Sequence, residues 1–281
     1  MASPSAPETD HWSSTSYTLT APFVPLLTTR LTTLLAPHAT NTILDLGCGD
    51  GVLTAQLSQK CKHILGLDAS PSMLATAQQQ YSTPNTAYEH LDCRYLKAFA
   101  QRHEHRYTKI FSNAALHWIL RDPETRADVI RGAFELLQPG GVFVAEFGAH
   151  GNVAEVHTAL ISALVHRGVD ISAAVAASPW YFPTEEGVRV LLGGAGFDVE
   201  VVETELRQTV LTEVEGGGVE GWVRLFGDSF LKAVGEGERE GVVREVVQVL
   251  EGVGRREEGA MAVNYVRLRF VARRPVEQER L

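Results

Sequence analysis

Short apolar runs alternate with segments of helical periodicity between residues 42 and 147. The first of these runs stop at a glycine or an acidic residue, which is typical of buried parallel strands that end in loops. The predicted strands are residues 42–46, 63–67, 86–90, 109–112 and 142–147, and the predicted helices between them are 53–60, 70–80 and 127–137. This alternation predicts a parallel sheet with helices on both faces.

The pattern outside this region is different. Apolar spacing predicts a helix over residues 23–35, which Pro37 ends. Beyond residue 148 we expect helices at 153–167, 184–192, 222–234 and 240–250, strands at 197–210 and 263–272, and acidic, glycine-rich loops at 212–221 and 235–241. The whole pattern predicts a Rossmann-like, doubly wound α/β fold, with a mostly parallel seven-stranded sheet, helices on both faces and a helical cap.

Composition narrows the class of protein. The 281 residues carry 34 acidic and 25 basic side chains, a formal net charge of −9, whereas nucleic-acid-binding surfaces are usually basic. The three cysteines form no C-x-x-C pair, which argues against a disulfide framework or a zinc cluster. No signal-peptide pattern and no membrane-length apolar run is present in the sequence. We therefore expect a cytoplasmic monomer or homodimer with no metal, no membrane and no nucleic acid among its partners.

A glycine-rich turn follows the first predicted strand. Gly47, Gly49 and Gly51 allow the backbone to approach a ligand closely, and the helix that follows offers its unpaired N-terminal amides. Asp68 ends the second predicted strand, where a carboxylate can accept both hydroxyls of a ribose. These features fit a dinucleotide and S-adenosylmethionine equally well.

Three other side chains favour S-adenosylmethionine. Asp45 precedes the turn, where it can meet the cationic end of an amino-acid ligand and would repel a pyrophosphate. Met73 can pack on an adenine face, although a plain core position explains it equally well. Asp92 follows the third predicted strand, where it can accept from an adenine amino group or simply form a turn.

The ordered motifs resemble those of class I S-adenosylmethionine-dependent methyltransferases. They are DLGCGDG at 45–51, LDASPSML at 67–74, LD at 91–92, FSNAALHWI at 111–119 and LLQPGGVFV at 136–144. Within that class, the 111–119 string, SPWYFP at 178–183 and GAGF at 194–197 are similar to trans-aconitate methyltransferases and their relatives.

The resemblance implies a role for each matching residue. Asp45, Gly47, Cys48 and Gly49 would line the methionine and sulfonium part of the cofactor, Asp68 would bind the ribose, Met73 and Asp92 would contact the adenine, and Asn113 and Ala114 would lie near the transferable methyl group. It also implies three parts: a tail and cap helix (1–38), the S-adenosylmethionine-binding core (39–150), and a C-terminal part (151–281) that forms the substrate pocket and completes the sheet.

Aromatic residues indicate where the methyl acceptor binds. His117 is the candidate catalytic residue, either as a base or as a hydrogen-bond donor to the substrate, and a place in the pocket wall or core is the alternative. The other candidate substrate contacts are Trp12, Tyr17, Phe23, Trp118, Trp180 and Tyr181, for each of which core packing is the competing explanation.

The expected activity is transfer of a methyl group from S-adenosylmethionine, which becomes S-adenosylhomocysteine, to a small molecule without the help of a metal. O-methylation of a carboxylate or hydroxyl group, in secondary metabolism, is the leading expectation. A carboxylate needs no base at neutral pH, whereas a phenol benefits from one. The alternatives are C-methylation of a quinone- or polyketide-like ring and, from another class, an NAD-dependent oxidoreductase.

Overall fold

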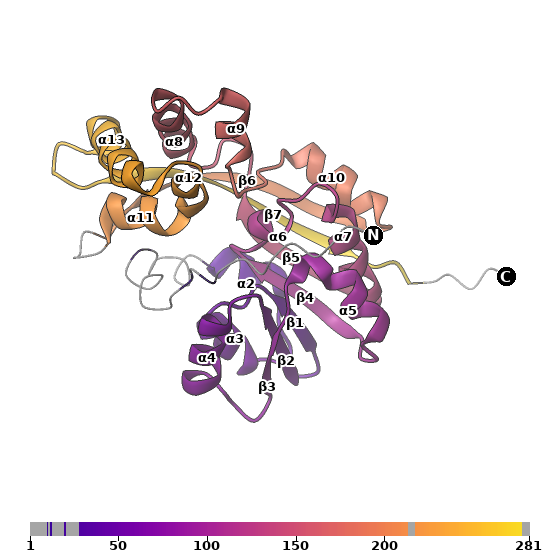
Figure 1. Cartoon of the computed structure of the whole chain (residues 1–281). Helices are drawn as coiled ribbons and strands as arrows, with labels where there is room; N and C mark the ends of the chain where they lie inside the picture. Colours follow the sequence, from indigo (N-terminus) through magenta and orange to yellow (C-terminus); the bar gives the residue numbers. More distant parts are fainter. Residues whose placement is uncertain (1–9, 11, 13–19, 21–27, 213–216, 277–281) are drawn as a thin grey trace.

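Seven strands form one mixed sheet in the order β3-β2-β1-β4-β5-β7-β6 (Figure 1). The computed structural model describes residues 10, 12, 20, 28–212 and 217–276. The strands are β1 (Thr42–Leu46), β2 (His63–Asp68), β3 (Thr86–His90), β4 (Tyr107–Asn113), β5 (Leu137–Gly148), β6 (Asp198–Val210) and β7 (Ala262–Arg273). Strands β1 to β5 pair in parallel, and β7 runs antiparallel between β5 and β6.

Helices cover both faces of the sheet because side chains alternate between the faces of each buried strand. On one face, strand residues such as Leu44 and Phe143 pack against α5 (Leu96–Arg102), α7 (Arg126–Leu136) and α10 (Glu185–Gly194). On the other face, Ile43 and Phe111 pack against α2 (Thr29–Leu35) and α3 (Val52–Ser58). The helix α4 (Pro71–Gln80) contacts β2 and β3. Two short helices, η2 (Cys93–Tyr95) and α6 (Leu116–Ile119), follow β3 and β4.

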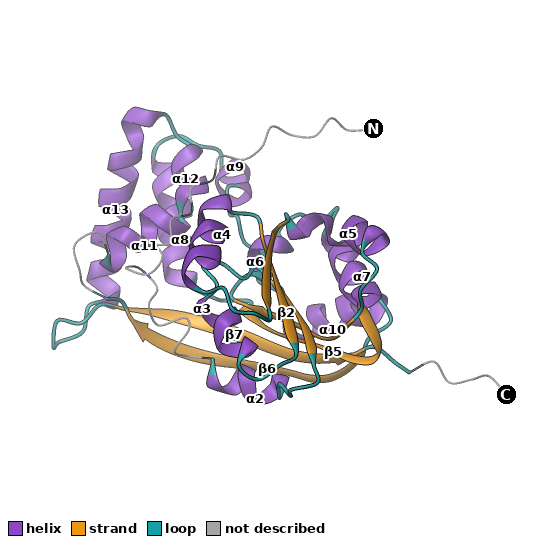
Figure 2. Cartoon of the chain, turned by 90° about the horizontal axis from the view of Figure 1, so that it is seen from below, coloured by secondary structure: helices purple, strands orange, loops and turns teal. Residues whose placement is uncertain are grey.

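A separate helical lobe lies at one end of the long strands β6 and β7 (Figure 2). It consists of α8 (Ala154–His166), α9 (Ile171–Ala176), α11 (Gly218–Phe226), α12 (Asp228–Lys232) and α13 (Glu236–Gly254). Its buried apolar side chains, with Trp222, Phe230 and Leu160 among them, form a core of their own that includes Met261 and Val263 at the start of β7. The lobe is the helical cap that the sequence predicts, and the fold class is confirmed.

Several predicted boundaries are corrected. Residues 235–241 are not a loop, because α13 begins at Glu236, and the loop expected at 212–221 ends where α11 begins at Gly218. The single helix expected at 222–234 is two helices, divided at Gly227. The helices η2, α5 and α9 were not predicted. Of the helix expected at 23–35, residues 23–27 lie outside the described residues and the remainder is confirmed as α2.

Candidate active site

The glycine turn lies at the carboxyl end of β1, where the backbone requires glycine. Gly47 has a φ of +73°, and a Cβ atom there would lie 2.2 Å from the Cβ of Ala115 in the loop after β4. Gly49 has a φ of +56° but nothing within 4 Å of the corresponding position. The turn is therefore closed toward β4 at Gly47 and open at Gly49, an arrangement that leaves room beside the backbone for a ligand.

Asp68 lies at the end of β2, directly beside this turn. One carboxylate oxygen accepts from the amide of Gly49 at 2.8 Å, and the other accepts from the amide of Ser70 at 2.9 Å. Burial raises the pKa of Asp68, and the backbone hydrogen bonds oppose that shift. Each oxygen retains capacity to accept a further hydrogen bond, so the carboxylate can hold the turn and a ligand hydroxyl together.

Asp45 is buried near the end of β1, one residue before the strand ends at Leu46. Only 2% of its surface is exposed, and it accepts a hydrogen bond of 2.7 Å from the hydroxyl of Thr54 in α3. Burial raises its pKa to about 7, and the nearby charge of Asp68 acts in the same direction. The negative charge of this buried carboxylate is stabilised by the Thr54 hydrogen bond but opposed by burial and by Asp68. A cationic ligand group would therefore be favoured beside it, and the charge of that group would favour the ionised form of Asp45.

The remaining residues expected near the adenosine differ in their surroundings. Met73 is buried in the first turn of α4, where its amide donates to the side chain of Ser70, the helix N-cap. Cys48 is buried, and burial raises the pKa of its thiol well above the usual range, so the thiol stays protonated. The carboxylate of Asp92 accepts from the guanidinium of Arg94 at 2.7 and 2.9 Å, and it also caps η2.

The chain bends sharply where β4 ends. Asn113 is the last residue of the strand, and Ala114 adopts the left-handed conformation at a φ of +56°, which is uncommon for a residue other than glycine. The amide of Ala114 donates to the carbonyl of Glu146 in β5 at 2.7 Å. This bend directs the chain over the glycine turn and brings α6 to the carboxyl edge of the sheet.

His117 is held in α6 against the end of β5. Its ring is 8% exposed, and Nδ1 accepts a hydrogen bond of 3.4 Å from the amide of Gly148. Because Nδ1 is the acceptor, the ring proton of the neutral form lies on Nε2. Burial lowers the pKa of His117 well below 6.5, and the positive charge of Arg267 lowers it further. The ring is therefore neutral at pH 7 and presents an N–H donor at Nε2.

Three of the predicted aromatic contacts meet in a cluster between the sheet and the helical lobe. The ring of Trp118 lies 5.3 Å from that of Trp12 and 5.8 Å from that of Trp180. The cluster continues through Phe182, Trp222, Phe226, Phe230 and His157. The members from α11 and α12 were not predicted, because the apolar periodicity of a helix indicates that a side chain is buried but not which residue it packs against.

Tyr181 lies apart from this cluster in its contacts. The guanidinium of Arg126 stacks over its ring at 3.6 Å, and its amide donates to the carbonyl of His117 at 2.8 Å. Tyr17 and Phe23 lie outside the described residues.

A buried ion network beside His117 was missed by sequence reasoning. Glu146, in β5, is 2% exposed and pairs with Arg207, Arg267 and Arg269 on β6 and β7. The alternation of arginines with apolar residues in the final strand predicted the strand but not this role. A sequence pattern that could have indicated the network is the pair of acids at alternate positions of the preceding strand, Glu203 and Glu205. In the structure, the register of β6 against β7 pairs Glu203 with Arg269 and Glu205 with Arg267.

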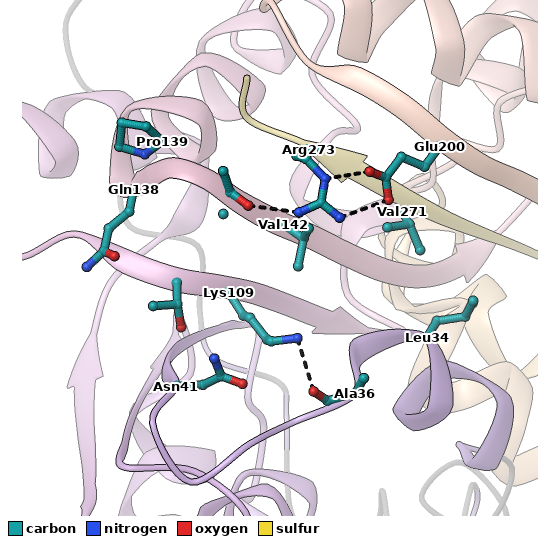
Figure 3. A pocket seen from close by; sticks show the side chains of 13 residues that line it. Leu34, Ala36, Asn41, Lys109, Gln138, Pro139, Val142, Glu200, Val271 and Arg273 are labelled. Carbon is teal, nitrogen blue, oxygen red and sulfur yellow. Dashed lines mark hydrogen bonds and ion pairs between the residues drawn. The ribbon is translucent and has the colours of Figure 1, made fainter. Parts of the chain in front are cut away.

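A hollow of about 430 Å³ lies at the opposite, amino end of the sheet (Figure 3). Its two cations are already engaged: Lys109 donates to the carbonyl of Ala36 at the end of α2, and Arg273 pairs with Glu200. This hollow lies away from the predicted site residues, and it brings together none of them.

A methyltransferase domain model matches residues 43–141. The chain is also 37% identical over 268 residues to an uncharacterized methyltransferase of Schizosaccharomyces pombe, a match that spans 94% of this chain and 98% of the relative. The chain belongs to the class I S-adenosylmethionine-dependent methyltransferases. The same match decides against the NAD-dependent oxidoreductase alternative.

Two relatives with named substrates match part of the chain. A trans-aconitate 2-methyltransferase from Deinococcus radiodurans is 37% identical over 110 residues, 38% of each chain. A malonyl-[acyl-carrier protein] O-methyltransferase from Bacillus cereus is 31% identical over 129 residues, 45% of each.

Solved structures support the fold of this methyltransferase. The YcgJ protein of Bacillus subtilis matches 88% of this chain and 96% of its own with a TM-score of 0.56 at 12% identity. The [4+2]-cyclase SpnF matches 90% of this chain and 82% of its own with a TM-score of 0.54 at 17% identity. Within the described residues, no helix is long and apolar enough to span a membrane, and no group of three metal-binding side chains is present.

Proposed function

We propose that this methyltransferase moves a methyl group from S-adenosylmethionine to a carboxylate oxygen of a small organic acid, giving a methyl ester without a general base. The cofactor supplies a methyl group on a sulfonium, whose leaving group is a neutral thioether. The protein then has to bind, align and desolvate the two partners.

The residues at the carboxyl edge fit this cofactor. The carboxylate of Asp68 would receive the ribose, with Met73 against the adenine and Asp92 near its amino group, and the open backbone at Gly49 would line the methionine part. Asp45, Gly47 and Cys48 would surround the methionine part, whose ammonium compensates the buried carboxylate of Asp45. Asn113 and Ala114, at the bend after β4, would lie near the methyl group.

The protonation of His117 is the reason for proposing a carboxylate as the methyl acceptor. A hydroxyl or phenol needs a group that takes its proton, but Nδ1 of His117 is engaged with Gly148 and Nε2 carries the proton. Glu146, a buried acid in β5, is held by three arginines. A carboxylate, already ionised at neutral pH, needs no base and suits a site of donors. The names of the relatives from Deinococcus radiodurans and Bacillus cereus, which match part of the chain, point in the same direction.

The substrate would enter between the sheet and the helical lobe. Trp118 contacts both Trp12 and Trp180, and the three rings offer an apolar wall for a carbon chain. Tyr181 would support this wall through its backbone bond to His117.

The test is to incubate the protein with methyl-labelled S-adenosylmethionine and a panel of aliphatic mono- and diacids, phenols and quinones. A carboxylate acceptor gives a product that releases labelled methanol in mild base. Label that stays in a base-stable ether or C-methyl product would overturn the proposal in favour of hydroxyl or ring methylation.

A further inference from the structure

β6 is a long edge strand whose outer side is open. It stands last in the strand order of the sheet and has 13 residues, whereas β3 at the opposite edge has five. No proline or lysine lies within residues 200–210, although these residues commonly protect an exposed edge from pairing. Three successive residues, Thr204, Glu205 and Leu206, are exposed. Neither face of the strand is therefore fully covered there by the residues that the structure describes.

The outward-facing backbone groups of β6 belong to its even-numbered residues. The amide of Leu211, just after the strand, donates to the carbonyl of Met261 at 2.9 Å, so position 211 faces β7. In an antiparallel pair, successive residues direct their N–H and C=O groups to alternate sides, and the register is regular over this half of the strand. Thr204, Leu206 and Gln208 therefore direct their backbone groups away from β7. No other backbone group among the described residues bonds to them.

The side chains along this edge are apolar on one face and charged on the other. Leu206 and Val210 are 67% and 47% exposed, and they share a face because side chains alternate along a strand. The other face carries Glu205 and Arg207, whose side chains pair at 3.0 Å. Exposed apolar residues next to opposite charges two positions apart are suited to pairing with another strand.

The pattern of this edge is complementary to itself. When a second copy of β6 runs antiparallel with a two-fold axis at Leu206, the two Leu206 side chains lie opposite each other. Glu205 of each copy then lies opposite Arg207 of the other, so the charges attract across the interface. The same register pairs the outward groups of Thr204 with those of Gln208, and each outward N–H in this stretch can donate to an outward C=O of the other copy.

Other registers are less favourable. Because only outward-facing residues can pair, the axis has to lie at an even-numbered position. An axis at Thr204 would place Glu203 opposite Glu205, and like charges directly opposite each other destabilise a strand pair. An axis at Gln208 would leave only residues 206–210 of each strand in the overlap. The charges and the length of the overlap together favour the axis at Leu206.

We propose that β6 pairs antiparallel with β6 of a second copy of this chain about a two-fold axis at Leu206, so that the two sheets continue into one sheet across a homodimer. Such an interface closes on itself, and it removes an edge that would otherwise be open to aggregation. β6 lies at the opposite end of the strand order from β1 and β2, which carry the predicted cofactor residues. The dimer is therefore independent of which acceptor the enzyme methylates.

Sedimentation equilibrium of the full chain measures the dissociation constant of the dimer. Leu206→Lys places two ammonium groups opposite each other at the axis and removes the apolar contact, so it should raise this constant at least about tenfold. Val253→Lys is the matched control, because Val253 is 71% exposed on α13 in the helical lobe, and it should leave the constant unchanged. The thermal melting point shows that both variants are folded.

Single cysteines test the register of the pairing. Residues directly opposite each other in a hydrogen-bonded pair have Cα atoms about 5.5 Å apart, which a disulfide can bridge. Leu206→Cys should therefore give a covalent dimer under mild oxidation with diamide. Two cysteines at position 208 would lie about 14 Å apart with this axis, so Gln208→Cys should not cross-link. The natural cysteines Cys48, Cys61 and Cys93 are buried, and the wild type gives the background.

Three results would overturn the proposal. A wild type that stays monomeric at about 100 µM would exclude a dimer of useful affinity and leave the edge to a strand of a different protein. A dimer that a folded Leu206→Lys variant forms as tightly as the wild type would use another surface. Cross-linking of Gln208→Cys but not of Leu206→Cys would exclude the axis at Leu206. None of these measurements requires a methyl acceptor, so they succeed or fail independently of the proposed function.

Discussion

The amide of Gly148 donates to Nδ1 of His117, and this contact fixes which nitrogen of the ring can meet a substrate. The ring then offers Nε2–H as a donor, in a residue whose pKa is lowered by burial. Of the two roles that the sequence left open for His117, the geometry favours the hydrogen-bond donor over the base.

The first prediction concerns this donor. Replacing His117 with Ala should raise KM for a carboxylic acid by about tenfold to a hundredfold, the cost of one hydrogen bond to an ion, with a smaller effect on kcat. Gln can place an N–H near the position of Nε2, so His117→Gln should recover part of the loss. The pH profile of kcat should show no step from His117 between pH 6 and 8. A base role would appear instead as a fall in kcat with no rescue by Gln.

The second prediction concerns Asp68. Its carboxylate holds the Gly49 and Ser70 amides and is proposed to bind the ribose. Asp68→Ala should weaken S-adenosylhomocysteine binding by about a hundredfold or more, because two hydrogen bonds to a charged acceptor are lost. Isothermal titration calorimetry measures this directly. Asp128→Ala, which breaks an exposed pair with Lys97, is the control and should bind as the wild type does. Near-normal affinity in Asp68→Ala would remove Asp68 from the cofactor site.

The third prediction compares two glycines of one turn. Gly47→Ala would place a methyl group 2.2 Å from the Cβ of Ala115 at a left-handed φ, so the turn must move. We expect a loss of about 2–4 kcal/mol in unfolding free energy and loss of cofactor binding. Gly49→Ala meets no atom within 4 Å and should cost only the left-handed strain, about 1 kcal/mol. Its extra methyl group should nevertheless weaken cofactor binding if the ligand approaches this backbone.

Urea unfolding of both variants, with and without S-adenosylhomocysteine, separates these effects. Equal stabilities for the two variants would show that the contact between Gly47 and Ala115 does not restrict the turn.

The sequence predicts features that depend on residues close together in the chain better than contacts between residues far apart in it. The helices predicted at 70–80 and 184–192 start at Ser70 and Thr184, residue types that favour N-caps, and each side chain accepts from the amide three residues ahead. Glycines at a strand end located the turn that is proposed to hold the cofactor, because local backbone geometry requires glycine there. The pairing of Arg267 with Glu146 spans 121 residues. It depends on the register of β7 against β5 and β6, which no local pattern specifies.

The helical lobe shows the same limit. The spacing of apolar residues predicted most of its helices, although Gly227 was not recognised as the division between α11 and α12. The ring contact between Trp118 and Phe226 joins the short helix α6, after β4, to α11 of the lobe. Such contacts build the proposed substrate wall, and they follow from how distant elements pack together.

The fourth prediction is a dependence of stability on pH that comes from Asp45. Its pKa is about 7 in the folded protein and 3.8 in an unperturbed chain, so the folded state binds more protons between these values. Stability from this group is therefore full below about pH 4 and falls as the pH rises toward 7. Asp45→Asn keeps the hydrogen bond from Thr54 and removes the titration. It should be more stable than the wild type at pH 8, by at most about 4 kcal/mol, and similar at pH 4.

Urea unfolding at pH 4, 6 and 8 checks the Asp45 prediction as a difference between the two proteins, which cancels the other titrating groups. A constant difference across this range would show that Asp45 titrates normally in the folded state. The same variant should bind S-adenosylmethionine less tightly at pH 8, because it lacks the carboxylate that is proposed to face the ammonium of the cofactor.

The last prediction tests the buried network around Glu146. Glu146→Gln removes the charge that Arg207, Arg267 and Arg269 share, and it leaves three cations together in a poorly solvated site. Loss of one partner of a buried ion pair costs about 3–5 kcal/mol, because the uncompensated charge stays buried. Glu200→Gln is the matched control, since Glu200 and Arg273 are 40% and 42% exposed and their pair should contribute less than about 1 kcal/mol. Urea unfolding at pH 7 measures both losses. If Glu146→Gln lost no more stability than Glu200→Gln, the three arginines would not depend on Glu146 for the compensation of their charge.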